Sequence, residues 1–351
     1  MSTVGIVLAT IALTFLGLFL LLKLGIGWWF KRLMKDVPGF AGMVVGQQSV
    51  SARITMTLEK LKFTDSHVYR VMSELKALGY QSAGRYTLDE LPGVQLWAGT
   101  HPENGSLALV FEANDRLFSV DLIRFYDSGA VLGAGTNPNY NAEDYPSDMQ
   151  YRPFPADTPM KDLAQWLAAR PRQATVVMAT PQNLRQLNTR MYAHMMDYRL
   201  SQSLPSFETW KAKATQEVLA HGHSAPKLTD AQWHTGYAGY LASFEEATEE
   251  ALKDHLLRSG AVTALEWEEV QYDLAFVYER LSAEGVAERA LGQSEWTPDE
   301  SRVESLMRQN LSHQALFEAI QDLLPPDERF HYLADVHQPL AARVYRPAVQ
   351  E

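Results

Sequence analysis

The sequence predicts a single N-terminal transmembrane helix, then an α+β domain in which helices pack on an antiparallel β-meander, and finally an all-α helical domain. Three observations support this order. An uncharged apolar run begins at residue 4, strand-like apolar segments with short turns occupy residues 94–133, and helical apolar spacing prevails beyond residue 226. We place the boundaries at 1–30 for the transmembrane anchor, 31–50 for a juxtamembrane linker, 51–220 for the α+β domain and 226–351 for the helical domain.

The N-terminal apolar run is long enough to cross a bilayer. Val4 to Leu22 comprises 19 uncharged residues, and a helix rises about 1.5 Å per residue, so the run approaches the thickness of the hydrocarbon core. It is not preceded by a basic residue or followed by a small-residue cleavage site, which argues against a cleaved signal. Side chains suited to the membrane interface follow the run: Lys23, Trp28, Trp29, Lys31, Arg32 and Lys35.

These basic residues also predict an orientation. Lysine and arginine near a membrane span gather on the cytoplasmic side. We therefore expect a single-pass protein of a bacterial inner membrane that contacts lipid through residues 4–30. Its N-terminus would lie outside and its later domains in the cytoplasm, and the absence of cysteine agrees with a reducing compartment.

The charge of the chain is concentrated in one window. The formal net charge is −11, and residues 241–300 carry 15 Asp and Glu against four Lys and Arg, so the remainder is formally neutral. Such a window disfavours nucleic acid and anionic lipid as direct partners. We interpret it as an acidic helix face exposed to solvent.

The α+β domain is predicted to begin with a helix and continue as strands. Apolar residues recur at helical spacing over 66–78, and Gly79 is suited to end that helix. Turn-like segments then separate four predicted strands near 94–98, 107–111, 117–126 and 130–133. Connections this short make consecutive strands antiparallel neighbours.

A long polar segment interrupts this pattern at residues 134–158. Loops of this length in compact domains are usually functional or disordered, and four aromatic side chains favour an ordered loop that binds or packs: Tyr140, Tyr145, Tyr151 and Phe154. Helices are predicted from Pro159, over about 181–200 and over 207–219, with a short strand near 174–178.

The C-terminal region is predicted to be helical throughout. Capping-box sequences begin at Thr229, Thr263 and Thr297. Apolar steps of three and four follow the first two, and Gly260 between them predicts an antiparallel helical hairpin. The third helix is expected over about 298–323.

Asp121 is the one catalytic candidate. It interrupts an apolar strand and shares a face with Ile123 and Phe125, so it is either a charge on a sheet edge or a buried, paired carboxylate. We expect no metal and no cofactor. The acidic residues before His255 lack the Glu-x-x-His spacing of a di-metal bundle, and Gly133–Thr136 lacks the remainder of a phosphate loop.

Three functional hypotheses remain. The first is a non-catalytic adaptor or assembly factor that binds a protein partner at the membrane, because the chain combines an anchor with no catalytic constellation. The second is a membrane-anchored hydrolase with its site at Asp121 and the 134–158 loop. The third is a winged-helix DNA-binding module, which would require two helices and a hairpin within residues 51–99 and a basic face on residues 51–90.

Overall fold

The computed structural model describes residues 51–60, 62–113, 115–138, 140–170, 174–220, 225–292, 294, 296 and 298–348. The predicted anchor and linker, with all six predicted interface residues, lie outside this part of the chain. In the described ranges, no helix is long and apolar enough to span a membrane. The described chain divides into two compact units, one containing 205–242 and the other containing 51–204 together with 243–348.

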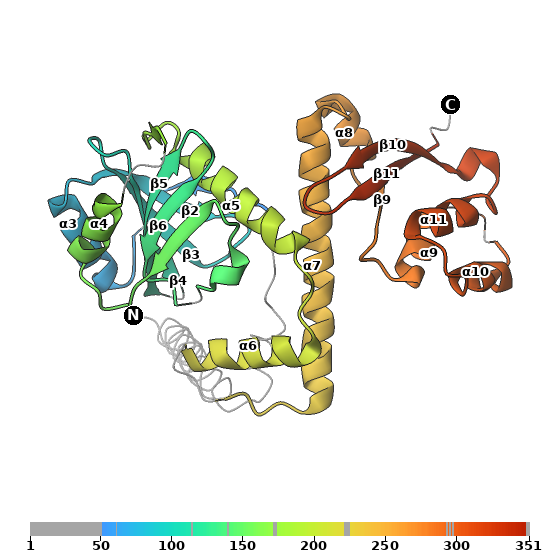
Figure 1. The fold of residues 1–351 in the computed structure, drawn as a ribbon, viewed down its shortest axis with the longest axis horizontal. Helices are drawn as coiled ribbons and strands as arrows, with labels where there is room; N and C mark the ends of the chain where they lie inside the picture. The colour runs from blue at the N-terminus through green and yellow to red at the C-terminus, as the bar shows by residue number, and fades with distance from the viewer. Residues whose placement is uncertain are drawn as a thin grey trace, which may run out of the picture. The chain divides into compact units, whose positions relative to one another are not determined.

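An eight-stranded sheet forms the body of the α+β region (Figure 1). Seven strands follow one another across it in chain order, and β8 pairs with β5 off this path. Their bounds are β1 Met56–Leu58, β2 Gln81–Leu88, β3 Val94–Thr100, β4 Leu107–Ala113, β5 Arg116–Tyr126, β6 Val131–Gly135, β7 Met149–Pro153 and β8 Val176–Val177.

The predicted meander is confirmed, and the sheet extends beyond it at both ends. Strands β1 to β6 are antiparallel neighbours, whereas β7 pairs parallel to β6, so the complete sheet is mixed. We had not expected β2, because its sequence contains little apolar alternation. A register shift at Gly84, whose φ is +147°, interrupts its pairing with β3.

Helices cover both faces of this sheet. Helices α3 (Ser66–Ala77) and α4 (Met160–Ala169) pack on one face, and α5 (Leu184–Ser201) packs on the other (Figure 1). Asp65 caps α3 by accepting from the backbone of His67. Residues 51–99 contain the single helix α3 among their described residues, so the two helices that a winged helix would need are not formed.

Two further helices follow α5. Helix α6 spans Phe207–Ala220, and α7 spans Asp230–Ser259. The capping box at Thr229 is confirmed, since Thr229 and Gln232 exchange hydrogen bonds at the start of α7. Gly260 follows the end of α7 with φ +73°, as a left-handed helix stop requires.

The all-α prediction for the C-terminal region is wrong in part. Helices α8 (Ala264–Val270), α9 (Ala283–Leu291), α10 (Glu300–Met307) and α11 (His313–Gln321) are present. A three-stranded antiparallel sheet in the order β10-β11-β9 accompanies them, with β9 at Ala275–Tyr278, β10 at Phe330–Val336 and β11 at Ala342–Pro347. The predicted helical hairpin is therefore replaced by α7, the short α8 and a strand.

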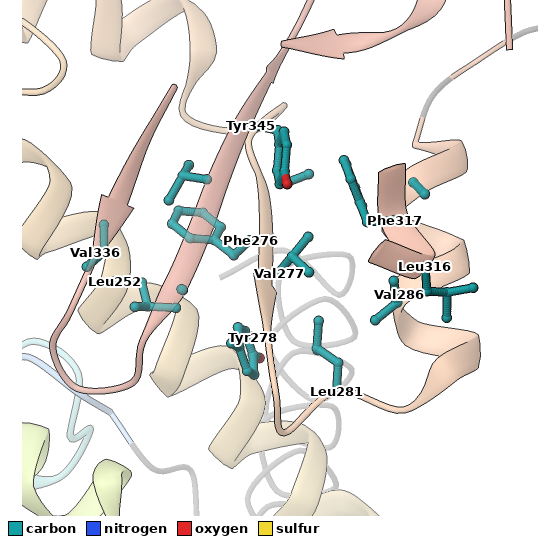
Figure 2. Close-up of a cluster of buried hydrophobic side chains, with 14 of the residues drawn as sticks. Leu252, Phe276, Val277, Tyr278, Leu281, Val286, Leu316, Phe317, Val336 and Tyr345 are labelled. Atoms are coloured by element: carbon teal, nitrogen blue, oxygen red, sulfur yellow. The ribbon is translucent and has the colours of Figure 1, made fainter. Parts of the chain in front are cut away.

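The error at β9 has a physical origin. All four residues of β9 are buried, and a buried strand gives an unbroken apolar run that also satisfies helical spacing. Figure 2 shows Phe276 and Val277 of β9 in a shared core with Phe317 of α11 and Tyr345 of β11. The rings of Phe317 and Tyr345 stack with centroids 4.3 Å apart.

The acidic face of α7 is not simply exposed to solvent, which corrects a second prediction. Arg289 of α9 pairs with both Glu245 and Glu249. Further along α7, Glu250 accepts from the backbone of Ala52 at 2.9 Å. Three carboxylates of this face, Glu245, Glu249 and Glu250, therefore hold neighbouring segments of the same unit, whereas Glu246 is exposed.

Candidate functional site

Asp121 lies in the interior of the sheet. It is part of β5, which has β4 on one side and β6 on the other, and its register partners are Leu109 and Gly135. The interpretation as an edge charge is therefore wrong. The side chain is a partly buried carboxylate on the same face as Ile123 and Phe125, as strand alternation predicts.

The 134–158 loop supplies the partner of this carboxylate. Tyr151 of β7 donates its hydroxyl hydrogen to Oδ1 of Asp121. Two glycines of β6 make room for the ring, because a Cβ on Gly133 would press on Tyr151 and a Cβ on Gly135 would overlap both Tyr151 and Asp121. The Gly133–Thr136 segment therefore serves close packing of side chains.

Burial perturbs both members of this pair. Desolvation raises the pKa of Asp121 to about 6, and the hydrogen bond from Tyr151 partly offsets that increase. Desolvation and the charge of Asp121 together raise the pKa of the Tyr151 phenol above its usual range. At neutral pH the pair is therefore a carboxylate that accepts from a neutral phenol.

Three of the four predicted loop aromatics gather over Asp121. The Tyr140 and Tyr151 rings stack with centroids 4.8 Å apart. The Tyr145 ring lies 5.1 Å from that of Tyr140 and 5.9 Å from that of Tyr151. The described part of the loop thus forms a cluster of three tyrosine rings, one of which is hydrogen-bonded to the carboxylate.

Phe154 belongs to a different cluster. Its ring meets Trp166 of α4 edge to face at 6.3 Å, and the guanidinium of Arg152 lies 5.4 Å from the Phe154 centroid. A second guanidinium, that of Arg170, lies 4.8 Å from the Trp166 ring. Arginines and aromatic rings thus alternate from β7 to the C-terminal end of α4.

An open groove of about 550 Å³ lies along this second cluster. Its lining is polar and aromatic, and it comprises Gln150, Tyr151, Arg152, Pro153, Trp166 and Arg170. Asp121 is not among the lining residues, because it lies on the α5 face of the sheet, whereas Phe154 and Trp166 pack on the α4 face. The hydrogen-bonded pair and the groove therefore share one residue and are otherwise separate.

The two arginines of the groove differ from the ion-paired arginines of the chain. Among the described residues, no carboxylate forms an ion pair with Arg152 or Arg170. By contrast, Arg53 pairs with Asp197 and Asp254 at 2.9 and 2.7 Å. The groove therefore presents exposed positive charge within a protein of net charge −11.

Sequence reasoning found the tyrosines and Phe154 but missed the groove arginines. The available signals were the alternation of arginine with aromatic residues in Tyr151–Phe154 and the four-residue spacing of Trp166 and Arg170. In the part of the chain that the structure describes, no group of three or more His, Asp or Glu side chains is arranged to hold a metal ion. Compared with known protein families, with curated proteins and with solved structures, the chain matches none of them.

Proposed function

We propose that this chain is a non-catalytic, membrane-anchored adaptor that holds a protein partner at the cytoplasmic face of a membrane. The partner would bind in the groove between β7 and α4. The observation that carries this proposal is the pair of groove arginines, which are exposed, stacked on aromatic rings and without a carboxylate partner among the described residues. The anchor itself rests on the sequence of residues 4–30.

The chemistry of the lining favours binding over catalysis. Its side chains are an amide, a phenol, two guanidiniums, a proline and an indole. Guanidiniums remain protonated at all physiological pH values, so they bind anions and do not act as general bases. The phenol of Tyr151 is already engaged with Asp121.

The hydrolase alternative keeps one supporting observation. A carboxyl with a pKa of about 6 suits general acid–base chemistry near neutral pH. Hydrolysis at Asp121 would require the Tyr151–Asp121 hydrogen bond to break, since the Tyr151 hydroxyl occupies the carboxylate. We rank the adaptor above it because the groove needs no such rearrangement.

Site-specific photo-crosslinking in native membranes tests the proposal. A photoreactive amino acid replaces Gln150, an exposed groove residue, and a control chain carries it at exposed Glu103 in the turn between β3 and β4. We expect a discrete crosslinked protein from position 150 and none from position 103. The absence of a product at position 150, or the same product from both positions, would overturn the groove as the binding surface.

The anchor is tested separately. Carbonate extraction should leave the full chain in the membrane fraction, and deletion of residues 1–30 should release it. Retention of the deleted chain would show that another part of the protein holds it at the membrane.

A further inference from the structure

Resting on the proposed adaptor function, we infer that the segment bound in the groove is a short acidic peptide of the partner, whose carboxylates pair with Arg152 and Arg170. Both arginines line one groove, and each is exposed. Some arginines of this unit are paired with carboxylates of the chain itself, as Arg289 is with Glu245 and Glu249. Within the described residues neither Arg152 nor Arg170 has such a carboxylate partner, so both guanidiniums can pair with an anionic ligand from another molecule.

The arginines are held in an orientation suited to carboxylates. Arg170 lies over the Trp166 ring at 4.8 Å, and Arg152 lies over Phe154 at 5.4 Å. A guanidinium stacked on a ring keeps its edge N–H groups available for two parallel hydrogen bonds to a carboxylate. Because the rings limit side-chain motion, less conformational entropy is lost on binding.

Among the described strands, none pairs with β7 on the side away from β6, and this edge offers an extended ligand few backbone contacts. The backbone N–H of Val131 donates to the carbonyl of Asp148, and the backbone N–H of Phe154 donates to the carbonyl of Gly135. The backbone N–H and C=O groups of even-numbered β7 residues therefore point toward β6. Tyr151 therefore directs its backbone groups outward, while Pro153 has no N–H to donate. Pro153 therefore limits strand addition along this edge, which leaves specificity to the arginines.

The surrounding charge favours a peptide over a polyanion. Residues 143–170 carry five acidic side chains and three basic ones. Nucleic acids and anionic membranes bind through many phosphates at once and need an extended basic surface. Two arginines within a slightly acidic region instead match a segment with one or two carboxylates.

Fluorescence anisotropy with the full chain in detergent micelles tests this inference. The probe is a labelled, end-capped peptide Gly-Asp-Glu-Asp-Glu-Gly, and its control has Asn and Gln in place of Asp and Glu. The variants are Arg152→Gln and Arg170→Gln, with Arg190→Gln as the matched control. Arg190 is exposed on α5 and has no ion pair among the described residues.

We expect saturable binding of the acidic peptide, weakened about tenfold by either groove substitution, which corresponds to about 1.4 kcal/mol. Arg190→Gln should change the affinity less than twofold, and the amide peptide should not bind. Equal binding of the two peptides, no binding of the acidic one, or an equal loss in all three variants would overturn the inference. Binding of single-stranded DNA or of phosphatidylglycerol vesicles through the same arginines, without the peptide, would also overturn it.

A competition experiment separates this inference from the adaptor proposal. Excess acidic peptide should reduce the crosslink from position 150, whereas the amide peptide should leave it unchanged. A partner that crosslinks but resists competition would contradict the acidic ligand and leave the adaptor standing. The absence of any crosslinked partner without added peptide would contradict the adaptor itself.

Discussion

Replacing Asp121 with asparagine should stabilise the protein at neutral pH, although it removes a buried hydrogen-bonded charge. The folded state raises the pKa of this carboxyl from 3.8 to about 6. Each pKa unit corresponds to about 1.4 kcal/mol, so ionised Asp121 lowers the free energy of unfolding by about 3 kcal/mol. Asparagine is nearly isosteric, and its amide oxygen can still accept the hydrogen bond from Tyr151.

The sign of the pH dependence follows from linkage. The folded state holds the Asp121 proton more tightly than the unfolded chain, so the destabilisation is complete above pH 6 and largely disappears as the pH falls toward 4. The difference in unfolding free energy between Asp121→Asn and the parent should therefore rise from about 0.5 kcal/mol at pH 4 to about 3 kcal/mol at pH 7.5.

Urea denaturation of both chains at five or six pH values measures this difference. Tryptophan fluorescence reports unfolding, because buried Trp97 lies in the same sheet. The control Asp157→Asn alters an exposed loop carboxylate and should give a small, constant difference. A constant difference for Asp121→Asn, or a loss of stability at pH 7.5, would refute the assignment of Asp121 as a desolvated carboxylate.

Three other substitutions test the packing around this site and the C-terminal core. Gly135→Ala should destabilise the sheet by about 3 kcal/mol in urea denaturation, because its Cβ must displace Tyr151 or Asp121; an unchanged midpoint would exclude this close contact. Arg53→Ala should lower the free energy of unfolding by about 2 kcal/mol, because the largely buried Asp197 loses one of its partners. Amide hydrogen exchange in α5 should become faster, and unchanged exchange there would contradict this prediction. Phe317→Ala should lower the free energy of unfolding by about 3–5 kcal/mol, because it opens a cavity beside Tyr345. A loss of less than about 1 kcal/mol in calorimetry would contradict the packed core in Figure 2.

Local patterns predicted much of the α+β region because its elements are amphipathic and short-range. The Ser66–Ala77 helix has a clear apolar face and a capping aspartate. The strands from Val94 to Gly135 are separated by turns of a few residues, which leaves antiparallel pairing as the only compact arrangement. Strand β7 could not be predicted in this way, because its parallel pairing with β6 depends on a crossover through the 134–158 loop.

The C-terminal sheet and the groove escaped prediction for different reasons. Buried β9 has the same apolar spacing as a helix, so only its tertiary partners reveal a strand. The groove joins Arg152 on β7 to Arg170 on α4, and no local pattern specifies that these side chains line one surface. Asp121 was identified because a charge within an apolar strand is a local anomaly, whereas its Tyr151 partner is a long-range contact.

Photo-crosslinking from position 150 in a chain that carries both Arg152→Gln and Arg170→Gln tests whether the groove arginines hold the partner. The parent chain should yield a crosslinked protein that excess acidic peptide displaces, and the doubly substituted chain should yield at most about one tenth as much. An undiminished crosslink in the doubly substituted chain would contradict the groove arginines as the partner-binding groups.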